Sequence, residues 1–214
     1  MKPYYDCDGI TIYHGDCREV LPTLPKCDLL LTDPPYGLGD KWDGGAGGEK
    51  SSWRIPSCEA KKWDMSTCDE LLSLAISKAE TAIVWGGNYY NLPASRCWLL
   101  WDKKQPDTWT TAQAEMAWTN LDRTVRVFRM AQCEAHAQSQ MLKKIHPAQK
   151  PFGLMQWCMK WADGKTILDP FMGSGTTLVA AKREGRKAIG IEISEAYCEA
   201  AAKRLQQSVF DFDS

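Results

Sequence analysis

The sequence lacks long apolar runs, a marked excess of either charge and paired cysteine motifs. No segment approaches the roughly 18 apolar residues that a membrane helix requires, and residues 1–6 lack the apolar stretch of a signal peptide. We therefore expect a cytoplasmic protein with no membrane partner. The 26 basic and 27 acidic residues give a net charge of −1, so any contact with a nucleic acid requires a local basic patch.

The nine cysteines are odd in number and contain no Cys-x-x-Cys pair. An odd set argues against a disulfide framework, and the missing pair argues against a zinc knuckle. We predict reduced cysteines that pack as small apolar residues, and no metal site.

The length of 214 residues, 44% of them hydrophobic, suits one domain, 1–214, with a full core. Short apolar runs typical of strands alternate with segments of helical periodicity. The predicted strands are 10–13, 28–32, 81–85, 97–101, 115–119, 124–129, 165–169 and 187–192, and the predicted helices are 17–24, 67–80, 152–161, 176–184 and 195–206. Several strands are continuously apolar, as expected when both faces are covered. The pattern predicts an α/β fold with a doubly wound, mostly parallel sheet of seven to eight strands.

Two segments depart from this alternation. Residues 37–48 contain six glycines, which is unfavourable for a regular element, so we predict a mobile glycine-rich flap over 37–64. Residues 123–150 carry six basic side chains against one acidic side chain, which is typical either of a solvated face or of contact with a polyanion. We predict a short basic target-recognition region there.

The segment 168–177 has the pattern of a strand-to-helix turn that binds a ligand. Glycines after Asp169 let a ligand approach the backbone at a helix N-terminus. Glu192 ends the next predicted strand, 23 residues later, about the spacing at which a carboxylate binds ribose hydroxyls. Leu178 replaces the third glycine of a dinucleotide fingerprint, and no complete phosphate-binding P-loop is present. S-adenosylmethionine fits this pattern, because its ammonium group suits Asp169 and its carboxylate suits backbone amides or a lysine.

A second motif, Asp33-Pro34-Pro35-Tyr36, directly follows the predicted strand 28–32. The two prolines fix the backbone and remove two donors, which leaves rigid carbonyls beside a carboxylate and an aromatic ring. Such a pocket suits a planar exocyclic amine: Asp33 and the Pro34 carbonyl each accept one N–H, and Tyr36 stacks on the base. Methylation at C5 of cytosine needs a thiolate, and the chain has no Pro-Cys dipeptide that could supply it.

These motifs together resemble the β class of DNA amino-methyltransferases, in which the catalytic motif precedes the cofactor motif. The matching segments are 33–36, 168–177, 146–151 and 190–192, with further matches at 15–17 and 85–90. The resemblance implies a circularly permuted Rossmann-like methyltransferase that is bacterial or phage-encoded and belongs to restriction-modification. It also implies methyl transfer from S-adenosylmethionine to a base flipped out of double-stranded DNA, and a possible homodimer.

The resemblance also implies roles for individual residues. Catalysis falls to Asp33, Pro34, Pro35 and Tyr36. Asp16 lies near the cofactor's adenine, Glu192 holds its ribose, and Asp169 binds its ammonium. The methionine end is lined by Phe171, Gly173, Gly175 and Thr176, with His146 and Lys150 flanking the same pocket. Trp42 and Trp53 either fill the gap left by an extruded base or pack the flap.

Alternatives remain open at this point. Asp33 favours N6 of adenine, because Ser-Pro-Pro-Tyr more often accompanies N4 of cytosine in the resembled class. Methylation of RNA or of a glutamine side chain, and a non-catalytic nucleic-acid-binding protein, are further readings. All the catalytic readings require the strands that end at Asp33 and Asp169 to be neighbours at the switch point of the sheet, although 136 residues separate them.

Overall fold

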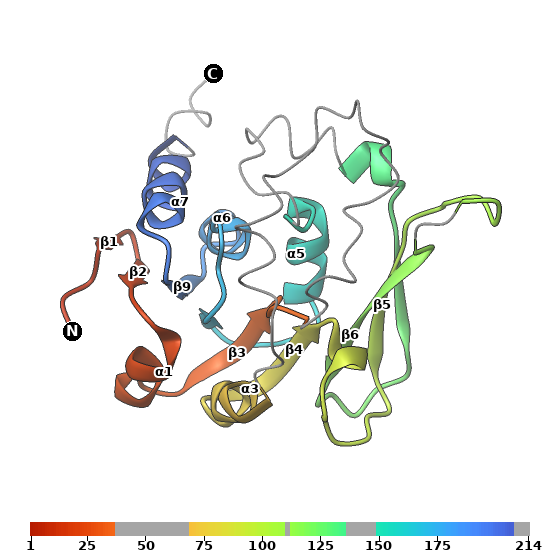
Figure 1. The fold of residues 1–214 in the computed structure, drawn as a ribbon, viewed down its shortest axis with the longest axis horizontal. Helices are drawn as coiled ribbons and strands as arrows, with labels where there is room; N and C mark the ends of the chain where they lie inside the picture. Colours follow the sequence, from red (N-terminus) through yellow and green to blue (C-terminus); the bar gives the residue numbers. More distant parts are fainter. Residues whose placement is uncertain (37–68, 110–111, 136–148, 208–214) are drawn as a thin grey trace.

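The computed structural model describes residues 1–36, 69–109, 112–135 and 149–207, which form an α/β fold (Figure 1). The strands are β1 (Tyr5–Cys7), β2 (Ile10–His14), β3 (Cys27–Thr32), β4 (Ala79–Trp85), β5 (Trp98–Asp102), β6 (Ala114–Thr119), β7 (Arg126–Arg129), β8 (Thr166–Asp169) and β9 (Lys187–Glu192). The helices are α1 (Cys17–Val20), α3 (Asp69–Ser77), α5 (Phe152–Met159), α6 (Thr176–Arg183) and α7 (Glu195–Gln207), with short 3-10 turns at Leu21–Thr23 and Gly87–Tyr89.

The strands form one sheet in the order β1-β2-β9-β8-β3-β4-β6-β5-β7. Neighbouring strands are parallel except where β1 and β6 meet their partners. This confirms the mostly parallel α/β prediction, with nine strands instead of seven to eight. The unpredicted strand, β1, has three residues and pairs with β2 across Asp8 and Gly9, whose φ angles are 51° and 77°. Asp-Gly is a hairpin-turn signal, so the sequence does carry a sign of this strand.

Helices cover both faces of the sheet, as predicted. One hydrophobic cluster joins α5, α6 and α7 to side chains such as Leu29 and Leu31, and the other joins α1 and α3 to side chains such as Leu30. Successive residues of β3 thus face opposite layers, which is the strand alternation expected of a doubly wound sheet. In Figure 1, α5, α6 and α7 lie on one side of the strands, and α1 and α3 lie on the other.

The predicted helix 67–80 is too long at its carboxyl end. Helix α3 ends at Ser77, and β4 begins at Ala79, which pairs with Cys27 of β3. Pairing of this segment with a buried neighbouring strand outweighs the helical preference of its residues. The predicted helix 17–24 is likewise shorter and changes to a 3-10 turn at Leu21, just before Pro22.

Strands β3 and β8 are joined by hydrogen bonds at both ends. The ladder between them pairs Leu29 with Ile167 and Leu30 with Leu168. At the amino end, the Asp28 carboxylate accepts hydrogen bonds from the backbone amides of Lys165 and Thr166 at 2.6 and 2.8 Å. The one Gly-Lys-Thr sequence of the chain, residues 164–166, therefore lies at the opposite end of the pair from Asp33 and Asp169, and it binds a carboxylate.

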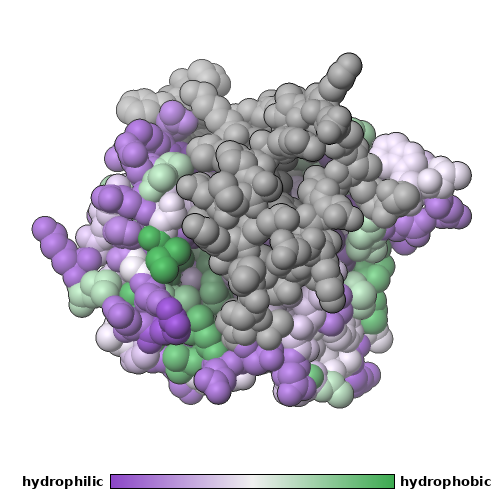
Figure 2. All heavy atoms as spheres, viewed as in Figure 1, coloured by the Kyte–Doolittle hydropathy of each residue, from purple (hydrophilic) through white to green (hydrophobic). Residues whose placement is uncertain are grey.

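Several sequence expectations fall outside the described residues: the flap 37–64 with Trp42 and Trp53, His146, and most of the basic region beyond residue 135. Each of the seven cysteines within the described ranges is a free thiol. In the same ranges, no helix combines the length and apolar character needed to cross a membrane. In the view of Figure 2, hydrophilic residues are frequent along the left and lower edges of the described surface, and a hydrophobic group lies left of the centre.

Candidate active site

The two predicted motifs meet at the carboxyl ends of β3 and β8. These strands are parallel neighbours, and the hydroxyl of Thr32 donates a hydrogen bond to Asp169 Oδ1 at 2.8 Å. Asp33, which follows Thr32, lies near enough to Asp169 for its charge to raise the pKa of that carboxyl. The expectation that the two strands are neighbours is confirmed, and the motif residues share one edge of the sheet.

Asp33 is held by two polar partners. Its Oδ2 accepts a hydrogen bond from the Lys150 ammonium at 2.6 Å, and its Oδ1 accepts one from the Tyr36 hydroxyl at 2.5 Å. The same ammonium donates to the Tyr36 hydroxyl at 3.0 Å. Burial raises the pKa of Asp33 despite the Lys150 charge, because a carboxylate withdrawn from water loses solvation.

Lys150 therefore contacts the Asp-Pro-Pro-Tyr motif. Its side chain is only 7% exposed. Lys150 therefore does not belong to a solvent-facing basic patch, although it is one of the six basic residues of the predicted region 123–150. Burial acts to lower the pKa of Lys150, but the carboxylates of Asp33 and Glu115 outweigh it and hold that pKa well above its ordinary value. Lys150 stays a cation in this environment.

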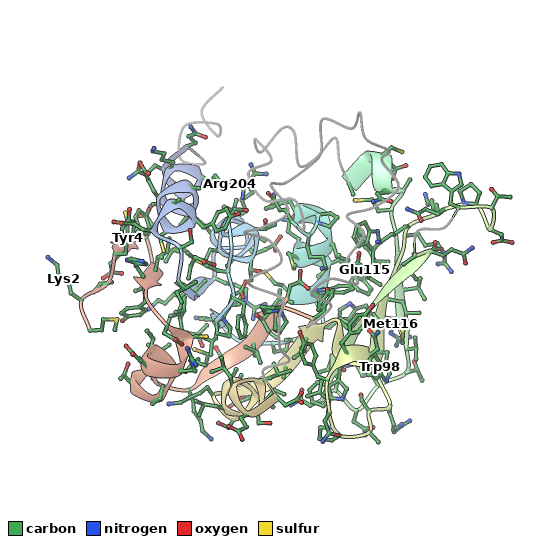
Figure 3. All side chains as sticks on the ribbon, viewed as in Figure 1. Lys2, Tyr4, Trp98, Glu115, Met116 and Arg204 are labelled. Carbon is green, nitrogen blue, oxygen red and sulfur yellow. The ribbon has the colours of Figure 1, made fainter. Side chains whose placement is uncertain are left out.

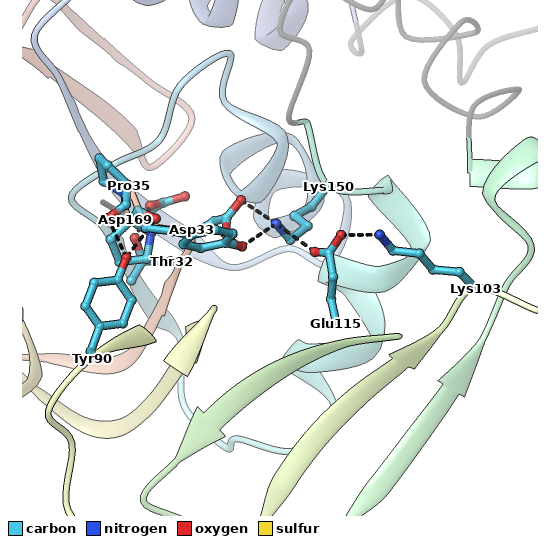
Figure 4. A network of polar contacts seen from close by, with 10 residues as sticks. Thr32, Asp33, Pro35, Tyr90, Lys103, Glu115, Lys150 and Asp169 are labelled. Atoms are coloured by element: carbon cyan, nitrogen blue, oxygen red, sulfur yellow. Dashed lines mark hydrogen bonds and ion pairs between the residues drawn. The ribbon is translucent and has the colours of Figure 1, made fainter. Parts of the chain in front are cut away.

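Glu115 and Lys103 extend this network (Figure 4), and the sequence analysis did not single out either residue. Glu115 Oε2 lies 3.1 Å from the Lys150 ammonium, and its Oε1 lies 2.6 Å from the Lys103 ammonium. Burial acts to raise the pKa of Glu115, but these two cations outweigh it and lower that pKa to about 2. The result is an alternating row of charges, Lys103, Glu115, Lys150 and Asp33, that sums to zero.

The topology explains why Glu115 is here. Strand β6 runs antiparallel to β4, and the Gly86 amide, just past β4, donates to the Met116 carbonyl at 2.8 Å. The start of β6 therefore lies at the edge where the parallel strands end. Met116 projects from the opposite face of the strand, since side chains alternate, and both residues are labelled in Figure 3. A charged residue opening an otherwise apolar strand was the available signal, but it needed the antiparallel order to interpret it.

The Pro34 and Pro35 carbonyls are fixed by Tyr90. The Tyr90 hydroxyl lies 3.0 Å from the Pro34 oxygen and 2.7 Å from the Pro35 oxygen. A carbonyl oxygen has two lone pairs, so each can accept a further donor. The bridge orients the carbonyls that the sequence predicted as acceptors and adds a tyrosine that it did not single out.

Tyr36 packs closely on the segment that follows β4. Its ring stacks on Tyr89 with centroids 4.9 Å apart and planes inclined by 19°. Gly86 has a φ of +67°, and a Cβ added there would lie 2.1 Å from the Tyr36 ring. Only glycine combines this backbone conformation with so close an approach. The Trp85–Tyr90 segment thus supports Tyr36, and the exposed Tyr89 covers one face of its ring.

Asp169 sits in a less charged setting than Asp33. In the described part of the chain it accepts hydrogen bonds from uncharged donors: the Thr32 and Thr177 hydroxyls and the Phe171 amide. Burial raises the pKa of Asp169 to about 6. A buried carboxylate without a cationic partner is stabilised when a ligand supplies a positive charge.

Glu192, the last residue of β9, bonds to the glycine turn, residues 170–175, which follows β8. Its Oε2 accepts the Gly173 amide at 3.0 Å and its Oε1 accepts the Ser194 amide at 2.8 Å, while burial raises its pKa. The Gly15 amide donates to the Glu192 carbonyl at 3.0 Å, which brings Asp16 to the same edge. Asp16 caps α1 and is paired with Arg18, and the Arg18 hydrogen bond lowers the pKa of Asp16.

The two glycines of the turn differ in their surroundings. Gly173 has a φ of +51°, and a Cβ added to it would have no neighbour within 4 Å among the described residues. Gly175, at +78°, caps α6, and a Cβ there would lie 2.7 Å from Ala201 of α7. Gly173 therefore leaves open space beside the Glu192 carboxylate, and Gly175 allows close packing of two helices. Thr176 is buried as the first residue of α6.

Of the predicted site residues, Asp33, Pro34, Pro35, Tyr36 and Lys150 form one group and Asp169, Phe171, Gly173 and Glu192 form the adjoining group. Asp16 lies at the far end of the second group. The described ranges contain no cluster of three or more His, Cys, Asp or Glu side chains that could hold a metal ion.

Comparisons with known proteins agree with this arrangement. Residues 49–203 match the family model N6_N4_Mtase, described as DNA methylase. The type II methyltransferase M.ScaI of Streptomyces caespitosus is 28% identical over 265 residues, covering 98% of this chain and 86% of that protein. The type II methyltransferase M2.DpnII of Streptococcus pneumoniae is 26% identical over 248 residues, covering 96% of this chain and 92% of that protein.

Two solved structures share the fold. The complex of M1.HpyAVI with SAM matches with a TM-score of 0.61 and 21% identity, over 92% of this chain and all of that one. The cytosine-N4-specific PvuII DNA methyltransferase matches with a TM-score of 0.66 and 18% identity, over the whole of this chain and 90% of that one. With the family model covering most of the sequence, the chain belongs to the N6/N4 DNA methylase family.

Proposed function

We propose that this protein transfers a methyl group from S-adenosylmethionine to the exocyclic amine of a DNA base, most favourably N6 of adenine in double-stranded DNA. The observation that carries the proposal is the hydrogen bond of 2.8 Å between Thr32 and Asp169. It joins the end of the Asp-Pro-Pro-Tyr strand to the end of the glycine-turn strand. An acceptor for the amine and a carboxylate for the cofactor therefore lie side by side.

Asp33 is suited to accept a hydrogen bond from the amine. Its carboxylate oxygens can each accept a further hydrogen bond, and the Pro34 carbonyl, oriented by Tyr90, offers a second acceptor. Two N–H bonds directed at these acceptors favour a tetrahedral nitrogen whose lone pair points out of the base plane. The amine lone pair otherwise delocalises into the ring and is a poor nucleophile.

The residues of the second group fit S-adenosylmethionine. When bound, this cofactor supplies an electrophilic methyl group on a cationic sulfonium. Asp169, whose pKa is about 6, suits the ammonium of the methionine part. A carboxylate has about four acceptor sites, so Glu192 can accept a ribose hydroxyl beside the amides of Gly173, Ile193 and Ser194. The space beside Gly173 lets a ligand approach the turn. Ile193, 63% exposed next to Glu192, offers an apolar face to the adenine.

The preference for adenine rests on Asp33 in the first position of the motif. The preference for duplex DNA rests on the resemblance to the family, and a base in a duplex must be flipped out, because an amine inside a stacked pair cannot reach a carboxylate at a sheet edge. By the same family analogy, we propose a cytoplasmic restriction-modification enzyme that can pair as a homodimer.

The test is transfer of labelled methyl groups to duplex DNA, single-stranded DNA and RNA in parallel, followed by digestion to nucleosides. We expect the label in N6-methyladenine from duplex DNA. Label in N4-methylcytosine would replace adenine by cytosine and keep the mechanism. No label in any nucleic acid, with the cofactor bound, would reject the catalytic function.

A further inference from the structure

In the described part of the chain, no hydrogen bond or ion pair joins Glu115 to the Asp-Pro-Pro-Tyr motif or to the glycine turn, but Lys150 bridges Glu115 and Asp33. Its Oε2 is 3.1 Å from the Lys150 ammonium, which is 2.6 Å from Asp33 Oδ2. Its other oxygen is 2.6 Å from the Lys103 ammonium. Both lysines are nearly buried, with side-chain exposures of 7% and 10%, so neither cation can exchange its carboxylate partner for water at little cost.

A lysine side chain has four rotatable bonds and no fixed geometry, so a single carboxylate does little to orient it. Lys150 has two carboxylates on different strands, Asp33 after β3 and Glu115 in β6, and the ammonium lies between them (Figure 4). Lys103 neutralises the far oxygen of Glu115. The pair Lys103–Glu115 is thus a rigid support behind Lys150.

We propose that Glu115 is a positioning residue: it holds the Lys150 ammonium against Asp33, and through Lys150 it keeps Asp33 ionised and able to accept the amine. This inference rests on the proposed role of Asp33. Asp33 in its protonated form would offer a donor where the amine needs an acceptor, so loss of the Lys150 contact suppresses transfer most strongly at low pH.

The direct and indirect effects of Glu115 have opposite signs. Among the described residues, the charged groups that face Asp33 are Lys150, Glu115 and Asp169, with the Tyr36 hydroxyl in contact and Lys103 behind Glu115. As a neighbouring negative charge, Glu115 alone raises the pKa of Asp33, so its removal would lower that pKa. As a support for Lys150, its removal raises that pKa, because the stabilising cation is lost.

The experiment measures single-turnover methyl transfer from pH 5 to 8.5 with saturating S-adenosylmethionine and DNA, using Glu115→Met, Glu115→Gln and the wild type. Met cannot hold an ammonium, whereas the Gln amide oxygen can. Protonation of Asp33 is expected to reduce the transfer rate at low pH, and we call this fall the acid limb of the pH–rate profile. For Glu115→Met we expect the acid limb to lie about one pH unit higher than in the wild type, with about a tenfold lower rate below the limb and a near-normal rate at pH 8.5. Glu115→Gln is expected to shift it less.

Glu80→Met is the matched control, because Glu80 is an exposed strand glutamate at the amino end of β4, away from the site. Its limb is expected to coincide with that of the wild type. An acid limb that moves to lower pH in Glu115→Met would show that Glu115 acts only by electrostatic repulsion of Asp33. An equal loss of transfer rate at every pH would show that Glu115 acts only in packing. Either result overturns the proposal.

Two further measurements keep the test decisive. If Glu115→Met fails to fold, Glu115→Asp, which keeps the charge on a shorter side chain, is expected to raise the limb by a smaller amount, and an unmoved limb overturns the proposal. Absence of methyl transfer by the wild type would reject the proposed function itself, and near-normal turnover in Asp33→Ala would reject the role of Asp33 on which the inference rests. Turnover lost in Asp33→Ala with an unmoved limb in Glu115→Met would reject only the inference about Glu115.

Discussion

An Asp-Pro dipeptide stands at the carboxyl end of each of two neighbouring strands, β3 and β8, but the two aspartates have different electrostatic surroundings. Asp33 after β3 is paired with the Lys150 ammonium at 2.6 Å. Asp169 at the end of β8 accepts, within the described ranges, only uncharged donors, and burial raises its pKa to about 6. Among the described residues, Lys150 supplies a counter-charge for Asp33 and no cation pairs with Asp169, which suits the cationic ligand that we propose for Asp169.

This difference suits the two aspartates to two different roles at one edge of the sheet, accepting hydrogen bonds from a neutral amine and pairing with a cationic ligand. A carboxylate with a built-in cation can accept hydrogen bonds from a neutral amine as long as it is ionised. A carboxylate without one gains most from a cationic ligand, such as the ammonium of S-adenosylmethionine. Two buried aspartates one strand apart would repel each other if both were ionised and unpaired, and Lys150 removes that conflict. Substitutions at the two ends are therefore expected to affect different steps.

Asp33→Ala is expected to have the largest effect. It removes the contact that we propose to the reacting nitrogen, and this loss is expected to cost roughly 3–4 kcal/mol in the transition state, or two to three decades in kcat. Cofactor affinity is expected to stay within about twofold, because Asp169 and Glu192 remain. Single-turnover rates together with calorimetric titration of S-adenosylmethionine measure both quantities. Equal losses in rate and cofactor affinity would contradict the division of tasks.

Asp169→Asn is expected to show the reverse pattern. Asn keeps the shape and an acceptor for Thr32 but loses the charge, so cofactor binding weakens by about 1.5–3 kcal/mol, or roughly 10- to 150-fold in Kd. The rate at saturating cofactor changes much less. 5′-Methylthioadenosine, which has no ammonium group, serves as the control ligand and is expected to bind both proteins alike. A similar loss for that ligand would mean that Asp169 acts on the fold and not on the charge.

Gly86→Ala tests the packing that supports the Asp33 side. Gly185→Ala is its matched control, since Gly185 has nearly the same φ, +66° against +67°, but an added Cβ there would meet no atom of the described ranges within 4 Å. Both variants carry the backbone strain, and only Gly86→Ala displaces the Tyr36 ring. We expect Gly86→Ala to unfold more easily than the control by about 1–3 kcal/mol and to lose activity. Equal denaturation midpoints and rates would reject a role for this close contact.

The pH dependence of cofactor binding gives the smallest expected effect. The pKa of Asp169 in the free protein, about 6, lies above the ordinary 3.8, so below pH 6 the site holds a proton that a bound ammonium must expel. Binding of S-adenosylmethionine is therefore expected to tighten as pH rises, with Kd about tenfold lower at pH 7 than at pH 5. Fluorescence titrations across this range measure the change, and a flat profile in the wild type would contradict the assignment.

The same sign applies to stability. A folded-state pKa above the ordinary value means that the native state binds the proton more tightly than the unfolded chain. The Asp169 contribution to the free energy of unfolding is then largest below about pH 4 and is lost as the pH rises through 6. Thermal melts of the cofactor-free protein are expected to show this trend, and Asp169→Asn is expected to reduce it.

Much of the fold was predictable because its strands have strong local patterns. Leu29, Leu30 and Leu31 face both layers, so a continuous apolar run identified a covered parallel strand. The neighbourhood of β3 and β8 was expected because the catalytic motif and the cofactor motif have to meet at the switch point of the sheet. The short β1 and the end of α3 were missed, since a three-residue hairpin strand has little periodicity and since strand pairing decides where α3 stops.

The site was predictable where residues adjacent in sequence act together, as in Asp33–Tyr36 and around Asp169. It was not predictable where distant elements meet. Glu115 reaches the site only because β6 is reversed in the sheet, and no pattern within the strand encodes that reversal. Lys150 was predicted for the cofactor pocket on the strength of its motif, whereas the structure sets it against Asp33.

The hydrogen bonds at the two ends of the β3 and β8 pair have a consequence for how such a protein can be assembled. Asp28 binds the start of β8, and Thr32 binds its end, so the alignment of the two reactive ends depends on the folded pair and not on which strand is synthesised first. The site therefore does not depend on the order of the two motifs in the sequence. A rearranged gene that encodes the glycine-turn half before the Asp-Pro-Pro-Tyr half would preserve it.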